Sequence, residues 1–131
     1  MPTVSLCVPG KPEHVRLVRL VASAAARRCG VDEDVLDEVR LAVGEACAIA
    51  LAHGRAADRA DDILIELSDG GGQFAVLVSE GGPQQGSNSE DQLAFAVISS
   101  VVPECVVDID AVPSTIKMIW PTASEGSLWP N

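Results

Sequence analysis

The amino-acid sequence predicts a two-layer α/β sandwich, in which a mixed, mostly antiparallel sheet carries helices on one face. Three observations support this α/β class. The periodic segments follow the order strand, helix, helix, hairpin, helix, hairpin. Hairpins pair their strands antiparallel, and amphipathic helices need an apolar surface to cover. The chain has 131 residues, of which 47% are hydrophobic, and this is enough for the core of one domain.

The first half of the chain is expected to contain one strand and two helices. Residues 3–8 alternate apolar and small polar side chains, as a short strand does. Over residues 13–29, apolar side chains recur at helical spacing, and Gly30 is a typical residue at the end of a helix. Asp32 is a suitable N-cap for a second helix, which we expect to end at Gly54.

The second half is expected to contain four strands and one helix. The turn sequence from Asp69 to Gly72 predicts a hairpin. Residues 80–91 are polar and rich in turn-forming residues, which predicts a loop. A helix is expected at residues 93–101, and the strands are expected at residues 63–67, 74–78, 105–109 and 115–120.

One domain is expected over residues 1–121, followed by a flexible tail at residues 122–131. Trp120 ends the last predicted strand, so it is expected to pack in the core. Trp129 lies in the polar tail beside Leu128, where it would dock on a partner or fold back on the sheet.

The balance of charged residues indicates which kinds of partner the chain can bind. Acidic residues outnumber basic ones by 19 to 9, for a net charge of −10. A nucleic-acid-binding protein would normally show a basic face, so direct binding of nucleic acid is not expected. The acidic charge suits a basic protein partner, or it serves solubility alone.

The cysteine spacing and the apolar runs predict a cytoplasmic protein. The four cysteines lie too far apart in sequence for a zinc or redox motif. The start of the chain lacks the pattern of a signal peptide, and no apolar run reaches the length of a membrane helix. We therefore expect reduced thiols and no membrane association.

The most informative motif lies in the second predicted helix. Residues 38–47 read Glu-Val-Arg-Leu-Ala-Val-Gly-Glu-Ala-Cys, and His53 and Gly54 follow. With the order of elements, this motif resembles the anti-sigma-factor serine kinases, the switch-protein branch of the histidine-kinase-like (GHKL) ATPases. The resemblance covers nearly the whole chain and implies the Bergerat fold of that family. It is strongest with an actinobacterial subgroup whose nucleotide site is degenerate.

The resemblance assigns roles to two positions in this motif. It implies that Glu45 is the general base, and that the place of Ile49 belongs to an asparagine that binds magnesium. Residues four apart lie on one helical face, so both would point into one pocket. An isoleucine has no ligand atom for a metal. Without that metal ligand, the sequence favours the plainer interpretation of Glu45 as a solvated or hydrogen-bonded helix carboxylate.

Three further motifs of the nucleotide site are also altered. The family reads Asp-x-Gly-x-Gly where this chain has Glu80, then Gly82, which matches, and Gln84. That stretch also reads as an ordinary surface turn. A Gly-Thr pair in the family corresponds to Ser114 and Thr115 here, so only the threonine is kept. The departures in this one pocket are Ile49, Glu80, Gln84, Ser114 and, at the start of the third helix, the acidic Asp91.

The sequence therefore favours a regulatory binding protein with lost or weakened ATP binding. It would bind an alternative sigma factor, an anti-anti-sigma (STAS-domain) protein, or both, in a partner-switching circuit. Arg19 occupies the position of a basic partner contact in the family, and Arg16 lies one turn earlier on nearly the same face. The plainer alternative for both arginines is a solvated charged face.

Two other functions stay open at the level of sequence. The first is an active serine/threonine kinase that uses Glu45, ATP and magnesium to phosphorylate a STAS-domain partner. The second is a scaffold subunit unrelated to sigma factors, since a fold does not determine a function. No cofactor is expected unless the nucleotide site is retained. The resemblance also implies homodimers.

Overall fold

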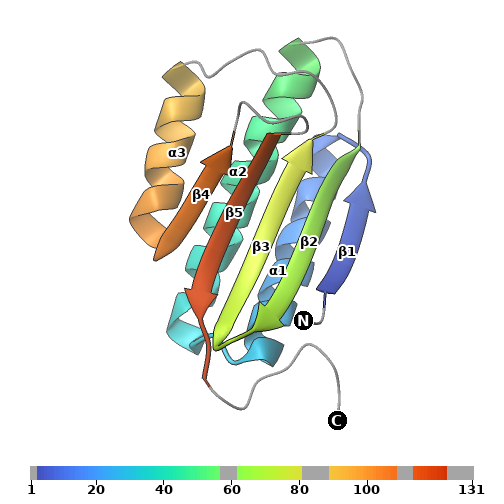
Figure 1. The fold of residues 1–131 in the computed structure, drawn as a ribbon. Coiled ribbons are helices and arrows are strands. Elements are labelled where there is room, and N and C mark those ends of the chain that lie inside the picture. Colours follow the sequence, from blue (N-terminus) through green and yellow to red (C-terminus); the bar gives the residue numbers. More distant parts are fainter. Residues whose placement is uncertain (1–2, 57–61, 81–88, 109–113, 124–131) are drawn as a thin grey trace.

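The computed structural model describes residues 3–56, 62–80, 89–108 and 114–123. Within these ranges the chain forms five strands, three helices and two short 3-10 turns (Figure 1). In chain order they are β1 (Thr3–Val8), η1 (Pro12–His14), α1 (Val15–Cys29), η2 (Glu33–Val35), α2 (Leu36–Ala56), β2 (Ile63–Gly70), β3 (Gln73–Glu80), α3 (Ser89–Val101), β4 (Glu104–Asp108) and β5 (Ser114–Pro121).

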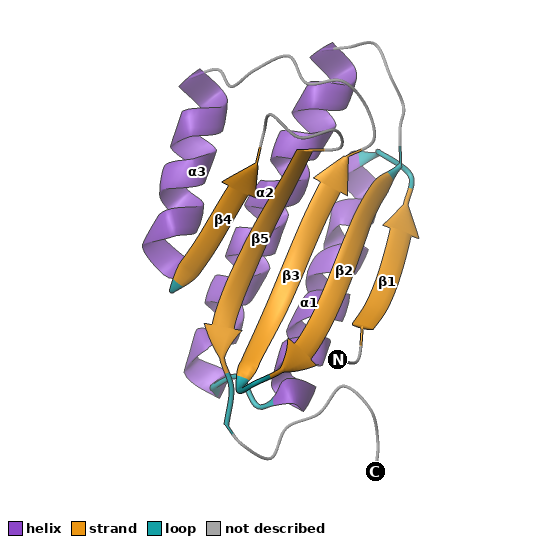
Figure 2. Cartoon of the chain, viewed as in Figure 1, coloured by secondary structure: helices purple, strands orange, loops and turns teal. Residues whose placement is uncertain are grey.

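The strands form one sheet in the order β1-β2-β3-β5-β4. Every neighbouring pair is antiparallel, so the mostly antiparallel sheet expected from the sequence has no parallel pair in the described strands. Figure 2 shows the described helices on one face of the sheet, with the other face left uncovered. The predicted two-layer α/β sandwich is therefore confirmed.

Several boundaries differ by a few residues from the sequence prediction, and two of these differences are in the helices α2 and α3. Gly54 does not end α2, which continues to Ala56. A glycine inside a helix costs about 1 kcal/mol relative to alanine, and the buried turn before it, with Ala50 and Leu51, holds the helix in place. Asp91 lies within the first turn of α3 and not in a loop, because the helix already begins at Ser89.

The core fills the space between the helix layer and the sheet. Helix α1 contributes small residues such as Ala22 and Ala26, which let it lie close to α2. Trp120 is fully buried, and its ring centroid lies 6.3 Å from that of Phe74. The predicted packing role of Trp120 is thus confirmed, whereas Trp129 lies outside the described residues. In the described part of the chain, no helix is both long and apolar enough to cross a membrane.

Cys47 lies at the centre of α2 and is fully buried. Burial raises the pKa of its thiol from 9.0 to about 12. The folded state therefore keeps a proton that the unfolded chain releases above pH 9.0. The stabilisation linked to this thiol is complete below that pH and is lost as the pH rises towards about 12.

We expect the melting temperature to fall steeply between about pH 9 and pH 11, and we expect Cys47→Ala to flatten this dependence. The measurement is thermal unfolding followed by circular dichroism across that range. Val43→Ala is the matched control, because it shortens a neighbouring fully buried side chain without removing a titratable group. Equal slopes for Cys47→Ala and the parent protein would contradict the assignment.

Candidate functional site

Helix α2 carries both Glu45 and Ile49, and their side chains line two different cavities. Ile49 is 5% exposed and faces the sheet, where it lines a cavity with residues of β3 and β5. Glu45 is partly exposed and lines a groove against α1. The spacing of four residues predicts one shared pocket, whereas among the described residues these two side chains line different cavities.

The cavity at Ile49 is almost filled with hydrocarbon. Its volume is about 10 Å³, which is room for about one water molecule. Sites for small molecules and cofactors typically enclose about 300–1,000 Å³. The described residues that line it are Ala46, Ile49, Ala50, Val78, Ser114 and Ile116.

These residues do not fit a magnesium-bound nucleotide. Magnesium requires oxygen ligands in octahedral geometry. Among the described lining residues, Ser114 alone carries a side-chain oxygen, and Ile49 stands where the family has an amide. Throughout the described ranges, no cluster of three or more His, Cys, Asp or Glu side chains is arranged to hold a metal ion.

The alternation of side chains along β5 decides which of its first residues line the cavity. Ser114 is buried and faces the helix layer, whereas Thr115 points to the uncovered face of the sheet, opposite Ser79. Among the described residues, Ser114 and not Thr115 therefore lines this cavity, and the assignment of Thr115 to the nucleotide pocket stays a prediction. The backbone of Glu80 pairs with Ser114 at the end of β3, and Gly82 and Gln84 lie outside the described residues.

The second hollow, which we name the α1–α2 groove, runs between these two helices. One part has a volume of about 180 Å³ and includes Glu45, Leu41 and Gly44. A second part has a volume of about 390 Å³ and includes Arg16, Ala48 and Leu51. Both parts are lined by Val15 and Arg19, so Arg19 stands where they meet.

Gly44 allows the side chain of Arg19 to lie across α2. A Cβ atom at this position would lie 3.1 Å from Cδ of Arg19, so a larger residue would push the arginine away. Sequence reasoning missed this residue. A glycine in the middle of a helix was the available signal, because it often marks a close approach.

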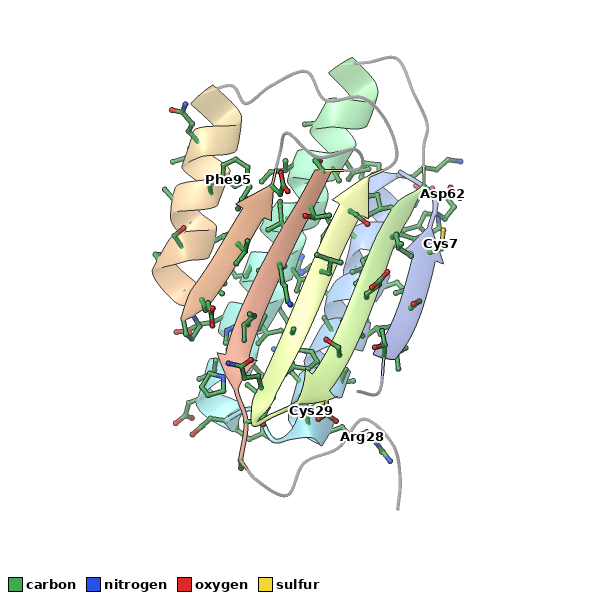
Figure 3. The ribbon with its side chains drawn as sticks, viewed as in Figure 1. Cys7, Arg28, Cys29, Asp62 and Phe95 are labelled. Atoms are coloured by element: carbon green, nitrogen blue, oxygen red, sulfur yellow. The ribbon has the colours of Figure 1, made fainter. Side chains whose placement is uncertain are left out.

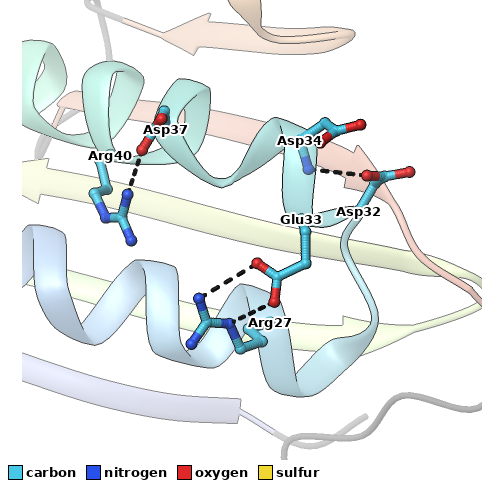
Figure 4. A network of polar contacts seen from close by, with 6 residues as sticks. All are labelled: Arg27, Asp32, Glu33, Asp34, Asp37 and Arg40. Atoms are coloured by element: carbon cyan, nitrogen blue, oxygen red, sulfur yellow. Dashed lines mark hydrogen bonds and ion pairs between the residues drawn. The ribbon is translucent and has the colours of Figure 1, made fainter.

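Arg16 and Arg19 differ from other arginines of the helix layer. Arg27 pairs with Glu33 at 3.0 Å, and Arg40 pairs with Asp37 (Figure 4). Within the described part of the chain, neither Arg16 nor Arg19 has an ion-pair partner.

The α1–α2 groove therefore combines two unpaired guanidinium groups with exposed apolar surface. Leu41 is 44% exposed beside Arg19. Arginine is preferred where carboxylates are recognised, because its planar group makes two oriented hydrogen bonds. The groove thus suits a protein surface that carries carboxylates next to apolar side chains.

Comparison with known proteins adds independent observations. The family described as Histidine kinase-like ATPase domain matches residues 8–120. The serine-protein kinase RsbW of Bacillus subtilis is 26% identical over 118 residues, which make up 80% of this chain and 74% of that protein. The protein of the same name from Bacillus licheniformis is 29% identical over 114 residues, or 76% of this chain and 71% of that protein.

A solved structure shows the same fold. It contains the RsbU and RsbW domains of a protein from Mycobacterium tuberculosis and superposes with a TM-score of 0.72. The match covers 93% of this chain and 32% of the other chain, with 20% sequence identity. The match therefore extends over most of the chain, and the expected histidine-kinase-like fold is confirmed.

Proposed function

Because the chain belongs to the histidine kinase-like ATPase family, we propose that it is an anti-sigma-like protein of a partner-switching circuit that binds proteins in place of a nucleotide. Its partners would be an alternative sigma factor, a STAS-domain antagonist, or both. The observation that carries this proposal is the contrast between the two hollows of α2. The cavity at Ile49 holds about 10 Å³, whereas the α1–α2 groove is open and carries unpaired arginines.

The partner surface that fits the groove follows from its charges. The chain carries a net charge of −10, so its overall field does not attract an acidic partner. Attraction to Arg16 and Arg19 is therefore local and requires carboxylates at the matching place on the partner's surface. Apolar side chains of that partner would cover Leu41, which is exposed beside Arg19. Burying a guanidinium–carboxylate pair beside apolar contacts is a common way to obtain a specific interface.

The proposal is tested by capture of partners from an extract of the native organism. The immobilised chain is expected to enrich an RNA-polymerase sigma subunit or a STAS-domain protein, identified by mass spectrometry. The matched bait carries Arg16→Glu and Arg19→Glu, which reverse the charge of the groove's two unpaired arginines at exposed positions. If neither protein class is enriched over this variant, the proposal fails.

A second function, an active serine/threonine kinase, is favoured by one observation. Glu45 is partly exposed and lies beside Arg19 in the groove, where a carboxylate could accept a proton from a partner's hydroxyl. The kinase reaction requires magnesium and ATP. Transfer of labelled phosphate to a captured STAS-domain protein, abolished by Glu45→Gln, would establish this function in place of simple binding.

A further inference from the structure

Strand β4 forms one edge of the sheet, and among the described strands it has a neighbour on one side only. Its five residues, Glu104–Asp108, pair with β5 in a continuous antiparallel register without a bulge. In an antiparallel ladder, alternate residues direct both their N–H and C=O groups to the same side. Some backbone groups of β4 therefore point away from β5, where they can bind the backbone of another extended chain.

The side chains of β4 are apolar in the centre and acidic at both ends. Cys105, Val106 and Val107 separate Glu104 from Asp108. Val106 is 53% exposed and Val107 is 38% exposed. The centre of an edge strand is usually protected by a lysine, a proline or a bulge. The centre of β4 carries none of these, so it stays open to another chain.

Helix α3 lies beside β4 at the same edge of the molecule (Figure 1). Phe95 lies on the side of α3 towards β4 and packs only partly against the core (Figure 3). Leu93, on the same helix, is 69% exposed. A strand in a two-layer sandwich needs apolar cover on one face. A strand added beside β4 would find that cover on α3.

The acidic ends of β4 disfavour a second copy of the chain at this edge. A two-fold axis that continues one sheet into another pairs the two edge strands antiparallel. Full-length pairing of two β4 strands would place Glu104 of each copy opposite Asp108 of the other. Like charges directly opposite each other destabilise a pair of strands. The strand that fits this edge has basic residues at its ends.

We propose that the outer edge of β4 is the docking site for an extended segment of a partner protein, which joins the sheet as a sixth strand. The segment has a basic residue at each end and three apolar or β-branched residues between them. The basic side chains lie opposite Glu104 and Asp108, on the uncovered face of the sheet. Two of the central side chains lie opposite Cys105 and Val107, on the face that carries the helices.

This edge is separate from the α1–α2 groove, because α2 lies between α1 and α3 (Figure 1). A strand on β4 and a partner in the groove can therefore be bound at the same time. The proposal does not depend on which protein the groove binds. Arg19→Glu should accordingly leave binding at β4 unchanged.

The first test uses the capped synthetic peptide Lys-Val-Thr-Val-Lys and follows the backbone amide signals of the isotope-labelled protein by NMR. The peptide should shift the signals of residues 104–108 in a saturable way. The peptide Glu-Val-Thr-Val-Glu should bind about tenfold more weakly, because it is repelled at both ends of β4. Equal binding of the two peptides, or no shift at residues 104–108, would overturn the proposal.

The second test separates backbone pairing from charge. One version of the lysine peptide carries N-methyl groups at its second and fourth residues, and another carries them at its first, third and fifth residues. In an added strand, only one of these two sets of N–H groups faces β4. One version should therefore lose binding while the other keeps it. Equal effects of the two methylation patterns would mean that side chains alone bind the peptide, and the proposal would fail.

The third test reverses the charge at one end of β4. Glu104→Lys should weaken binding of the lysine peptide about tenfold and strengthen binding of the glutamate peptide. The matched control is Glu13→Lys, which makes the same change at an exposed position beside α1 and should leave both affinities unchanged. Equal effects of the two variants overturn the proposal, because net charge would then control binding. Signals of β4 that shift on dilution of the free protein also overturn it, since a second copy would then occupy the edge.

Discussion

Replacing Arg19 with glutamate is expected to weaken capture of the sigma-factor or STAS-domain partner by about 100-fold, equivalent to about 3 kcal/mol. Arg19 stands where the two parts of the α1–α2 groove meet, and in the described residues it has no ion-pair partner. A partner carboxylate would pair with it there. A glutamate would repel that carboxylate inside a partly desolvated interface. Binding is measured by titration calorimetry with the purified partner.

Lys117→Glu is the matched control for this charge reversal. Lys117 is exposed on β5 and points to the uncovered face of the sheet, away from the groove. The Lys117→Glu variant should bind the partner with an affinity within about twofold of that of the parent protein, because surface charges far from an interface contribute little. If both variants weaken binding equally, net charge and not the groove controls the interaction.

Gly44→Ala separates the position of Arg19 from its charge. The added methyl group would meet Cδ of Arg19 at 3.1 Å, so the flexible arginine must move while its charge is kept. Alanine in place of glycine also favours the helix by about 1 kcal/mol. Binding should therefore fall several-fold without loss of stability. Unchanged binding would show that the partner does not require this orientation of Arg19.

Ile49→Asn is expected to lower the free energy of unfolding by about 3 kcal/mol without creating a site for ATP. Burial of an isoleucine side chain contributes about 1.5–3 kcal/mol, and a buried amide without partners costs a further 1–3 kcal/mol. Ile49 is 5% exposed in a cavity of about 10 Å³. An asparagine there meets mostly hydrocarbon, and of the lining residues that the structure describes only Ser114 carries a side-chain oxygen.

Urea unfolding measures the loss of stability, and calorimetry with magnesium and ATP measures binding. The matched control is Ile49→Val, which keeps an apolar side chain and should cost about 1 kcal/mol. The parent protein should show no rise in melting temperature with magnesium and ATP, since a ligand stabilises only a state that binds it. Magnesium-dependent ATP binding by Ile49→Asn would mean that the pocket is far less altered than proposed.

Most of the fold was predictable from the sequence because periodicity reports directly on burial. The alternation in β1 and the helical spacing in α1 predicted those elements, and the structure confirms them. The end of α2 was not predictable from Gly54, since a buried helix turn outweighs the local cost of one glycine. The start of α3 was missed for a related reason. The polar residues Ser89 to Asp91 resemble a loop in composition, although acidic residues are also favourable in the first turn of a helix.

The sequence by itself determined the family, the order of elements and the absence of a metal-binding amide at Ile49. Only the tertiary structure decided that Glu45 and Ile49 face different hollows, that Ser114 and not Thr115 meets the cavity, and that the cavity is nearly filled. The physical reason is that a motif specifies which side chains share a helix or strand. How far that element is rotated against its neighbours depends on packing between residues distant in the chain, here α2 against α1 on one side and against β3 and β5 on the other.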